Sequence, residues 1–157
     1  MANKVLSALG FIGFILMIVL PLVYYPNLPD RIPTHYGFNG VPDNFGAKNG
    51  IWILTGIGAI LYIGLKLLGM NIHRFKYNQD ELSAGQSIFY RQYTRQTLEI
   101  VNLISVSAFA YINYATIQVA FGTQQGLGLW FLPLLLLLVT GLVAYTLINA
   151  RKLKKME

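Results

Sequence analysis

Four long hydrophobic blocks dominate the sequence and restrict what the chain can fold into. They run over residues 5–24, 51–70, 98–121 and 129–150, and a helix needs roughly 20 apolar residues to cross a bilayer. In hydrocarbon every backbone N–H and C=O must be paired within the protein, which a helix achieves inside one segment. We therefore predict an all-α membrane protein with four transmembrane helices, folded as a single membrane domain over residues 1–157.

The composition favours lipid over water as the main solvent of this chain. Hydrophobic residues make up 55% of the sequence and charged residues 11%, whereas soluble domains carry about 25% charged residues. This balance excludes a soluble enzyme and a disordered chain. The absence of cysteine excludes a disulfide framework and a Cys-ligated metal. We expect no cofactor and no bound metal.

The basic residues predict the direction in which the chain crosses the membrane. With the N-terminus inside, ten of the twelve Lys and Arg residues lie in inner segments, and only Arg31 and Lys48 lie outside. Basic residues are enriched on the cytoplasmic side of membrane proteins. We therefore predict that both termini face the cytoplasm, in the inner membrane of a bacterium. The net charge of +6 then reflects topology and attraction to anionic lipid, and we expect no nucleic-acid partner.

The first hydrophobic block follows Lys4, as the core of a signal peptide would. No small-x-small cleavage motif comes after it, because the next residues are Tyr-Tyr-Pro-Asn-Leu-Pro. We expect a retained anchor helix.

The inner segment, residues 71–97, combines basic and aromatic residues. We expect Asp80 to cap a new helix with Glu81 in its first turn, and the stretch from about Ser87 to run as a helix without a break into the third span. We expect His73 to lie at the membrane interface. Basic and aromatic side chains mix near the membrane: Tyr90, Arg91, Tyr93 and Arg95. We interpret them as an interfacial belt, and the alternative is a docking site for a cytoplasmic partner.

The third block is the most polar of the four. Asn102 and Asn113 are eleven positions apart, which brings them within about 20° of each other around a helix. Polar side chains in lipid face the interior of a bundle, so we predict a packing seam here. Lys66 and Glu99 should meet at the cytoplasmic ends of neighbouring helices and form an ion pair. An ion or proton path is the alternative. Three glycines of the second block should allow close helix approach: Gly56, Gly58 and Gly64.

The outer loop, residues 25–50, is too constrained for a flexible connection. Four prolines restrict its backbone: Pro26, Pro29, Pro33 and Pro42. The pair Asn39-Gly40 is a strong tight-turn signal. We predict an ordered lid of short extended pieces over the outer mouth of the bundle, docked by Tyr36, Phe38 and Phe45.

The charged residues of this loop admit several interpretations. His35 could form a small metal or acid–base cluster with Asp30 and Asp43, although no established ligand spacing is present. Alternatively, Asp43 caps the turn, Arg31 and Lys48 pair with the two aspartates, and His35 donates a hydrogen bond to a carbonyl. Recognition of a partner or ligand is the third possibility, and its candidate residues are Pro29, Asp30, Pro33, His35, Gly40, Asp43 and Lys48.

One resemblance covers this loop. The pattern Leu28-Pro29, Ile32-Pro33-x-His35, Gly40, Asp43, Gly46 and Lys48, just after a first span, resembles the signature of a bacterial membrane domain of unknown function. That domain forms the N-terminal part of SdpI-like proteins, the immunity family for the sporulation-delaying toxin. With both flanking spans the resemblance covers about residues 5–70, and the longer immunity members carry spans that this chain lacks. It implies an immunity or signalling role and no catalytic residue.

Three functional hypotheses follow. The first is an SdpI-like immunity or signalling component that recognises a partner or a membrane-active peptide through the outer loop. The second is an accessory subunit of a larger membrane complex, because the leucine-rich run 134–138 has apolar surface all round. The third is a small metal-dependent membrane enzyme, which we rank last because no nucleophile motif is present. We expect no enzymatic activity.

Overall fold

The structure is a computed structural model that describes residues 2–72 and 82–156. Four long helices cover most of these residues: α1 (Ala2–Tyr24), α2 (Gly50–Met70), α3 (Ala84–Ala120) and α4 (Phe131–Lys154). A 3-10 turn, η1 (Tyr25–Asn27), and two strands, β1 (Arg31–Tyr36) and β2 (Pro42–Ala47), connect α1 to α2. All four helices are long and apolar enough to cross a membrane, as the sequence predicts. The description all-α is too narrow, because the two strands pair into an antiparallel hairpin.

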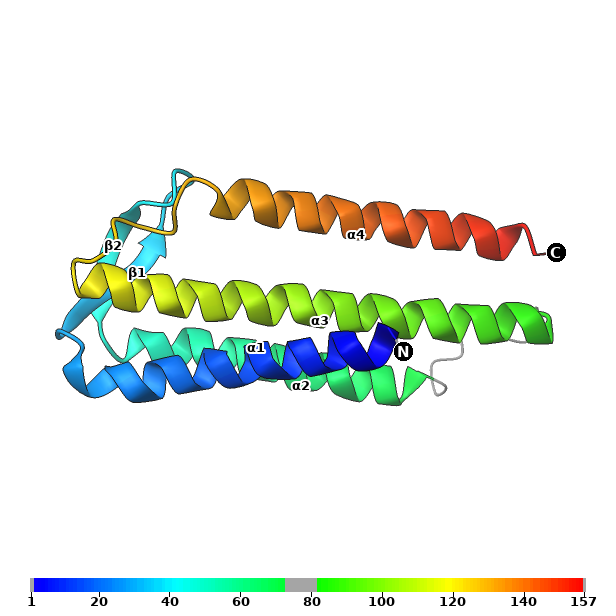
Figure 1. The fold of residues 1–157 in the computed structure, drawn as a ribbon, viewed down its shortest axis with the longest axis horizontal. Helices are drawn as coiled ribbons and strands as arrows, with labels where there is room; N and C mark the ends of the chain where they lie inside the picture. Colours follow the sequence, from blue (N-terminus) through cyan, green and yellow to red (C-terminus); the bar gives the residue numbers. More distant parts are fainter. Residues whose placement is uncertain (1, 73–81, 157) are drawn as a thin grey trace.

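Helix α3 is the centre of the bundle. It packs against α1 and α2 on one side and against α4 on the other, so α3 separates α4 from the first two helices (Figure 1). The hairpin and the α3–α4 loop lie at one end of the molecule, which we call the hairpin end. Both chain termini and the start of α3 lie toward the opposite end (Figure 1), which we call the termini end.

Helix α3 is much longer than a bilayer requires. Its 37 residues correspond to about 55 Å of helix, whereas the hydrocarbon core of a bilayer is about 30 Å thick. The helix is continuous through Ser87, as expected. It begins after Ser83, whose side chain accepts from the Gln86 backbone while the Gln86 side chain accepts from the Ser83 N–H. The expected cap, Asp80, and His73 lie outside the described residues.

Close packing of α1, α2 and α3 depends on one glycine of α2. Met17 of α1 and Val106 of α3 are fully buried. A Cβ built on Gly58 would lie 2.4 Å from the Met17 sulfur, so this position admits no larger residue without displacement. The expected close approach is therefore confirmed at Gly58. It is wrong at Gly56 and Gly64, where a Cβ would meet nothing within 4 Å.

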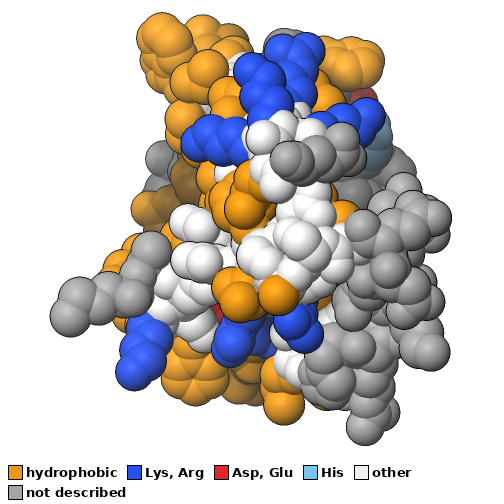
Figure 2. Space-filling model, turned by 90° about the vertical axis from the view of Figure 1, so that its right-hand side faces the viewer, with side chains coloured by type: hydrophobic (Ala, Val, Ile, Leu, Met, Phe, Trp, Pro, Cys, Tyr) orange, Lys and Arg blue, Asp and Glu red, His pale blue; other side chains and the backbone are white. Residues whose placement is uncertain are grey.

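The basic residues gather at the termini end. Figure 2 looks onto that end and shows Lys and Arg side chains over several parts of its face. Eight of the ten described basic residues lie at that end, seven within helices and Lys155 directly after α4: Lys4, Lys66, Arg91, Arg95, Arg151, Lys152, Lys154 and Lys155. The other two, Arg31 and Lys48, lie at the hairpin end.

Candidate functional site

The hairpin is docked on the bundle by a small apolar cluster. Ile32 of β1 is 1% exposed and packs with Leu28, Ile51 of α2 and Ile117 of α3. Burial of a side chain of this size contributes roughly 1.5–3 kcal/mol relative to exposure in water. The segment between α1 and α2 thus contains two short strands. Its main anchor is Ile32, a residue of the resemblance pattern for which the sequence predicted no packing role.

The turn of the hairpin has the predicted tight geometry. Gly40 has a φ of +74°, a conformation that glycine adopts without steric cost. The Gly40 N–H donates to the Gly37 carbonyl over 2.8 Å. The Val41 N–H donates to the Asn39 side chain over 3.1 Å. The tight-turn prediction for Asn39-Gly40 is confirmed.

A second contact fixes this turn to the α3–α4 loop. The Leu127 N–H donates to the Gly40 carbonyl over 2.7 Å, and the Tyr111 hydroxyl of α3 donates to the Leu127 carbonyl over 2.7 Å. Gly126 packs directly on the turn, since a Cβ there would lie 2.1 Å from the Gly40 oxygen. We call this set of contacts the glycine latch. No pattern in the sequence predicted these contacts, and their only local signal is the glycine spacing in GTQQGLG.

Tyr36 ties the end of β1 to α3. Its hydroxyl lies 2.9 Å from the Thr116 hydroxyl. Burial raises the pKa of the Tyr36 phenol above its ordinary value of 10.0, while the hydrogen bond to Thr116 acts in the opposite direction. The phenol therefore stays protonated at neutral pH, and the expected docking role of Tyr36 is confirmed.

The two phenylalanines do not dock the hairpin, contrary to expectation. Phe38 at the tip of the turn is 100% exposed, and Phe45 of β2 is 42% exposed. The Phe38 side chain points into solvent although the turn that carries it is held by the glycine latch. Phe38 instead belongs to a group of exposed apolar side chains at the hairpin end, which we call the apolar rim: Phe38, Val41, Leu129 and Trp130.

The charged residues of the hairpin form two separate pairs. His35 Nδ1 lies 2.5 Å from Asp43 Oδ1, and both side chains are more than half exposed. Lys48 Nζ lies 3.5 Å from Asp30 Oδ1, as one of the alternatives anticipated. Arg31 donates to the Phe45 carbonyl over 3.0 Å.

The structure does not gather His35, Asp30 and Asp43 into one cluster, because Asp30 precedes β1 at the base and the other two lie toward the turn. Within residues 2–72 and 82–156, no group of three or more His, Asp or Glu side chains could hold a metal ion. Of the other candidate recognition residues, Pro29 is exposed and Pro33 is buried. An outward surface for a partner can therefore include Pro29 but not Pro33.

The polar face of α3 is a packing seam, as predicted. Asn102 donates to the Tyr62 carbonyl of α2 over 3.3 Å. Asn113 donates to the Met17 carbonyl of α1 and to the Thr55 hydroxyl of α2, each over 3.0 Å. Both amide groups are almost completely buried, and their oxygens have no partner among the described residues.

The predicted ion pair is also present, at the termini end of the same helices. Lys66 Nζ of α2 lies 2.5 Å from Glu99 Oε2 of α3. The ammonium also donates to the Ser7 hydroxyl of α1 over 2.7 Å. The pair therefore joins three helices, and its side chains are 22% and 14% exposed.

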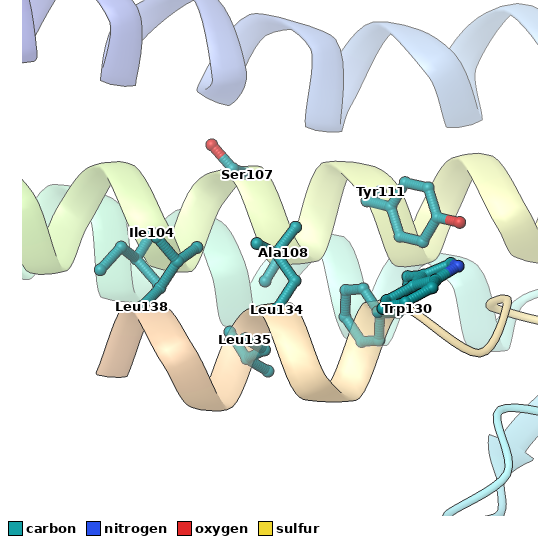
Figure 3. A pocket seen from close by; sticks show the side chains of 9 residues that line it. Ile104, Ser107, Ala108, Tyr111, Trp130, Leu134, Leu135 and Leu138 are labelled. Atoms are coloured by element: carbon teal, nitrogen blue, oxygen red, sulfur yellow. The ribbon is translucent and has the colours of Figure 1, made fainter. Parts of the chain in front are cut away.

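A long apolar groove separates α3 from α4. It has a volume of about 340 Å³. In Figure 3 Tyr111 and Trp130 lie at one end of it and Ile104 and Leu138 at the other, while the Ser107 hydroxyl points away from α4. The rings of Tyr111 and Phe131 stack with centroids 5.2 Å apart. Helix α4 therefore contacts α3 through this ring stack near the hairpin end and again at the termini end, where Gln86 donates to the Leu153 carbonyl over 3.5 Å.

The interfacial belt is only partly described. Tyr90 and Tyr93 contact each other edge to face, with ring centroids 5.5 Å apart. Arg91 donates back to the Ser87 carbonyl of its own helix over 3.2 Å. The rest of the proposed docking site for a cytoplasmic partner, residues 73–81, lies outside the described residues.

The family comparison matches the hairpin and parts of its two flanking helices. Residues 12–59 match the model of a family described as "Domain of unknown function (DUF1648)". A stretch of 77 residues is 36% identical to an uncharacterized protein of the archaeon Archaeoglobus fulgidus, and it covers 46% of this chain and 42% of that protein. The chain thus spans less than half the length of this relative. No solved structure matches the chain. The segment from mid-α1 through the hairpin to mid-α2 is therefore the part that is similar to a described family.

Proposed function

We propose that this chain is a multi-pass protein of the cytoplasmic membrane, with both termini inside and the hairpin at the outer surface. The asymmetry of its basic residues supports this orientation. Eight of the ten described Lys and Arg residues lie at the termini end, and basic residues are enriched on the cytoplasmic side. The four apolar helices are compatible with such a protein.

We further propose that the hairpin recognises a membrane-active peptide or a protein partner at the outer membrane surface. The observation that carries this proposal is Phe38, a fully exposed aromatic side chain on a turn that is held in place from both sides. The Gly40 carbonyl accepts from Leu127, and Tyr36 bonds Thr116. A turn that is already ordered loses little conformational entropy on binding, and aromatic side chains contribute strongly to recognition.

The apolar rim suits a ligand that lies at the membrane surface. Trp130 and Leu129 immediately precede α4, so they would lie where this helix enters the bilayer, a depth that tryptophan favours. Phe38 and Val41 continue the rim onto the hairpin. The exposed His35–Asp43 pair adds polar groups beside it.

The resemblance of the hairpin to SdpI-like proteins supports an immunity or signalling role for this recognition. A direct test expresses the chain in cells that are sensitive to the sporulation-delaying toxin and measures survival after exposure to that peptide. We expect protection by the unchanged chain and loss of protection in Phe38→Ser, His35→Ala and Asp43→Ala.

The matched control is Ile88→Ser, which removes an exposed apolar side chain of α3 at the termini end. It should protect as well as the unchanged chain, and all variants should reach the membrane at equal levels. If the three hairpin variants also protect fully at equal levels, the hairpin is not the recognition site.

A second candidate function is an accessory subunit of a larger membrane complex, and helix α4 favours it. This helix has α3 as its main neighbour and exposes several leucines, among them Leu136 and Leu137. Gentle purification of the unchanged chain should then also recover a defined second chain. The variant Ala108→Trp, whose larger side chain would fill the α3–α4 groove, should no longer recover it. A protein that purifies alone as a monomer in several mild detergents contradicts this candidate.

A further inference from the structure

A cavity of about 400 Å³ lies at the termini end between α1, α2 and α3. Helix α1 contributes Asn3, Lys4 and Ser7 to its wall, and α3 contributes Arg95 and Glu99. The cavity is separate from the hairpin and from the α3–α4 groove, which have other lining residues. Its wall carries charged and hydrogen-bonding side chains, in contrast to the apolar groove.

The one carboxylate in this wall is already neutralised. Glu99 is paired with Lys66 over 2.5 Å, and Lys66 is fixed further by the Ser7 hydroxyl over 2.7 Å. Lys4 and Arg95 are exposed and have no ion pair with any described residue. The wall therefore holds two cations whose charge is not balanced within the described parts of the chain.

The other described carboxylates cannot supply this balance. Asp30 and Asp43 are at the hairpin end, and they already pair with Lys48 and His35. Lys4 and Arg95 are therefore free to bind an anion from outside the chain, unless a residue outside the described ranges pairs with them. At the surface of a bilayer the abundant anions are lipid phosphates.

The wall also changes in polarity with depth, as a phospholipid does. Helix α1 runs from the termini end toward the hairpin end (Figure 1), so Asn3 and Lys4 lie at the mouth of the cavity. Ala8 and Phe11 continue the same wall one and two turns deeper. Along α1, the polar Asn3 and Lys4 at the mouth and the apolar Ala8 and Phe11 below them match a phosphate headgroup followed by an acyl chain.

We propose that this cavity binds the phosphate group of an anionic phospholipid. Lys4 and Arg95 donate to the phosphate oxygens, Asn3 provides a further donor, and an acyl chain lies along Ala8 and Phe11. The Lys66–Glu99 pair holds the three helices together around the site without repelling the anion. A lipid bound here would cross-link α1 and α3 at the membrane surface, which is a function distinct from recognition by the hairpin.

Native mass spectrometry of the full chain in detergent tests this site with dioleoyl phosphatidylglycerol, and with dioleoyl phosphatidylcholine for comparison. We expect phosphatidylglycerol to bind more tightly. In the double variant Lys4→Gln/Arg95→Gln its affinity should fall about fivefold for each basic side chain removed. The variant Ala8→Trp keeps every charge but fills the apolar part of the cavity, and it should also weaken binding.

The matched control is Arg151→Gln/Lys152→Gln, which removes the same charge from α4, outside the cavity, and should leave the affinity nearly unchanged. Equal losses in the two double variants would mean diffuse attraction to the basic end and would overturn the proposal. Equal binding of the two lipids would overturn it as well.

A third arm separates a lipid headgroup from a free phosphate. Soluble glycerol 1-phosphate carries the same phosphate chemistry without acyl chains, and it should fail to displace bound phosphatidylglycerol at equal concentration. Displacement would overturn the lipid assignment in favour of a soluble phosphate compound. Circular dichroism and gel filtration confirm that each variant is folded before binding is measured.

Discussion

Individual residues in this protein separate into those that hold helices together and those that the fold leaves exposed. Lys66 joins three helices because it reaches both Glu99 and Ser7. Removal of one member of such a pair leaves an uncompensated charge at partial burial, which is more costly than replacement of both members by apolar residues. Phe38, in contrast, is fully exposed and so contributes nothing to packing.

Gly58 provides the sharpest test at the residue scale. We expect Gly58→Val to lower the free energy of unfolding by about 1–3 kcal/mol, since overpacking of a close helix contact displaces its neighbours. The clash is with the buried Met17 side chain. Thermal unfolding in detergent, followed by circular dichroism, measures the effect.

Gly56→Val is the matched control, because Gly56 lies two positions before Gly58 on the same helix and a Cβ there meets nothing within 4 Å. It should unfold at nearly the same temperature as the unchanged chain. A comparable loss in both variants would mean that the helix backbone, and not the contact with Met17, is sensitive to the substitution.

Among the structural elements, the hairpin is the one whose position depends most on distant parts of the chain. Its base packs through Ile32 on α2 and α3, its strand end bonds Thr116, and its turn is held by the glycine latch. An isolated two-stranded hairpin is at best marginally stable in water. These three contacts therefore account for its order.

Gly126→Ala should release the turn from the α3–α4 loop. The added Cβ would overlap the Gly40 carbonyl, so the bond from Leu127 to Gly40 must break or lengthen. We expect amide hydrogen exchange in residues 37–47 to become at least about tenfold faster, since local opening is then less costly. Exchange in α1 and α2 should not change.

Gly141→Ala serves as the control for this prediction, because a Cβ at position 141 of α4 has no neighbour within 4 Å. It should leave exchange in the hairpin unaltered. If the turn of Gly126→Ala exchanges as slowly as that of the unchanged chain, Ile32 and Tyr36 alone are sufficient to hold it.

On the scale of the whole molecule, the two ends differ in charge and in shape. The termini end carries most of the basic side chains (Figure 2), and the hairpin end carries the apolar rim. Such a difference supports the proposed orientation, because anionic lipid attracts basic side chains. The two proposed binding sites lie at opposite ends and would act in different leaflets.

The orientation is measured directly by labelling of single cysteines, since the chain has none of its own. We expect Asn39→Cys, in the hairpin turn, to react with a membrane-impermeant maleimide in intact cells. Ala84→Cys, at the start of α3, should react only after the membrane is permeabilised. The reverse pattern would invert the topology and place the hairpin in the cytoplasm.

The sequence by itself determined the four helices, the hairpin turn and the Lys66–Glu99 pair. Each of these depends on local properties: hydrophobic length, a turn dipeptide, and the similar depth of two charges in neighbouring helices. The family resemblance noted on the hairpin agrees with the match over residues 12–59 only to the level of a domain of unknown function.

Only the tertiary structure decided which residues dock the hairpin and which remain exposed. Tyr36 and Thr116 are 80 positions apart, and the contact of Gly40 with Leu127 spans a similar separation, so neither has a local pattern. The same holds for Gly58, which differs from Gly56 and Gly64 only in the face of α2 that meets Met17. Aromatic residues are suited to burial and to recognition alike, so only the three-dimensional contacts show that Ile32 is buried and Phe38 is exposed.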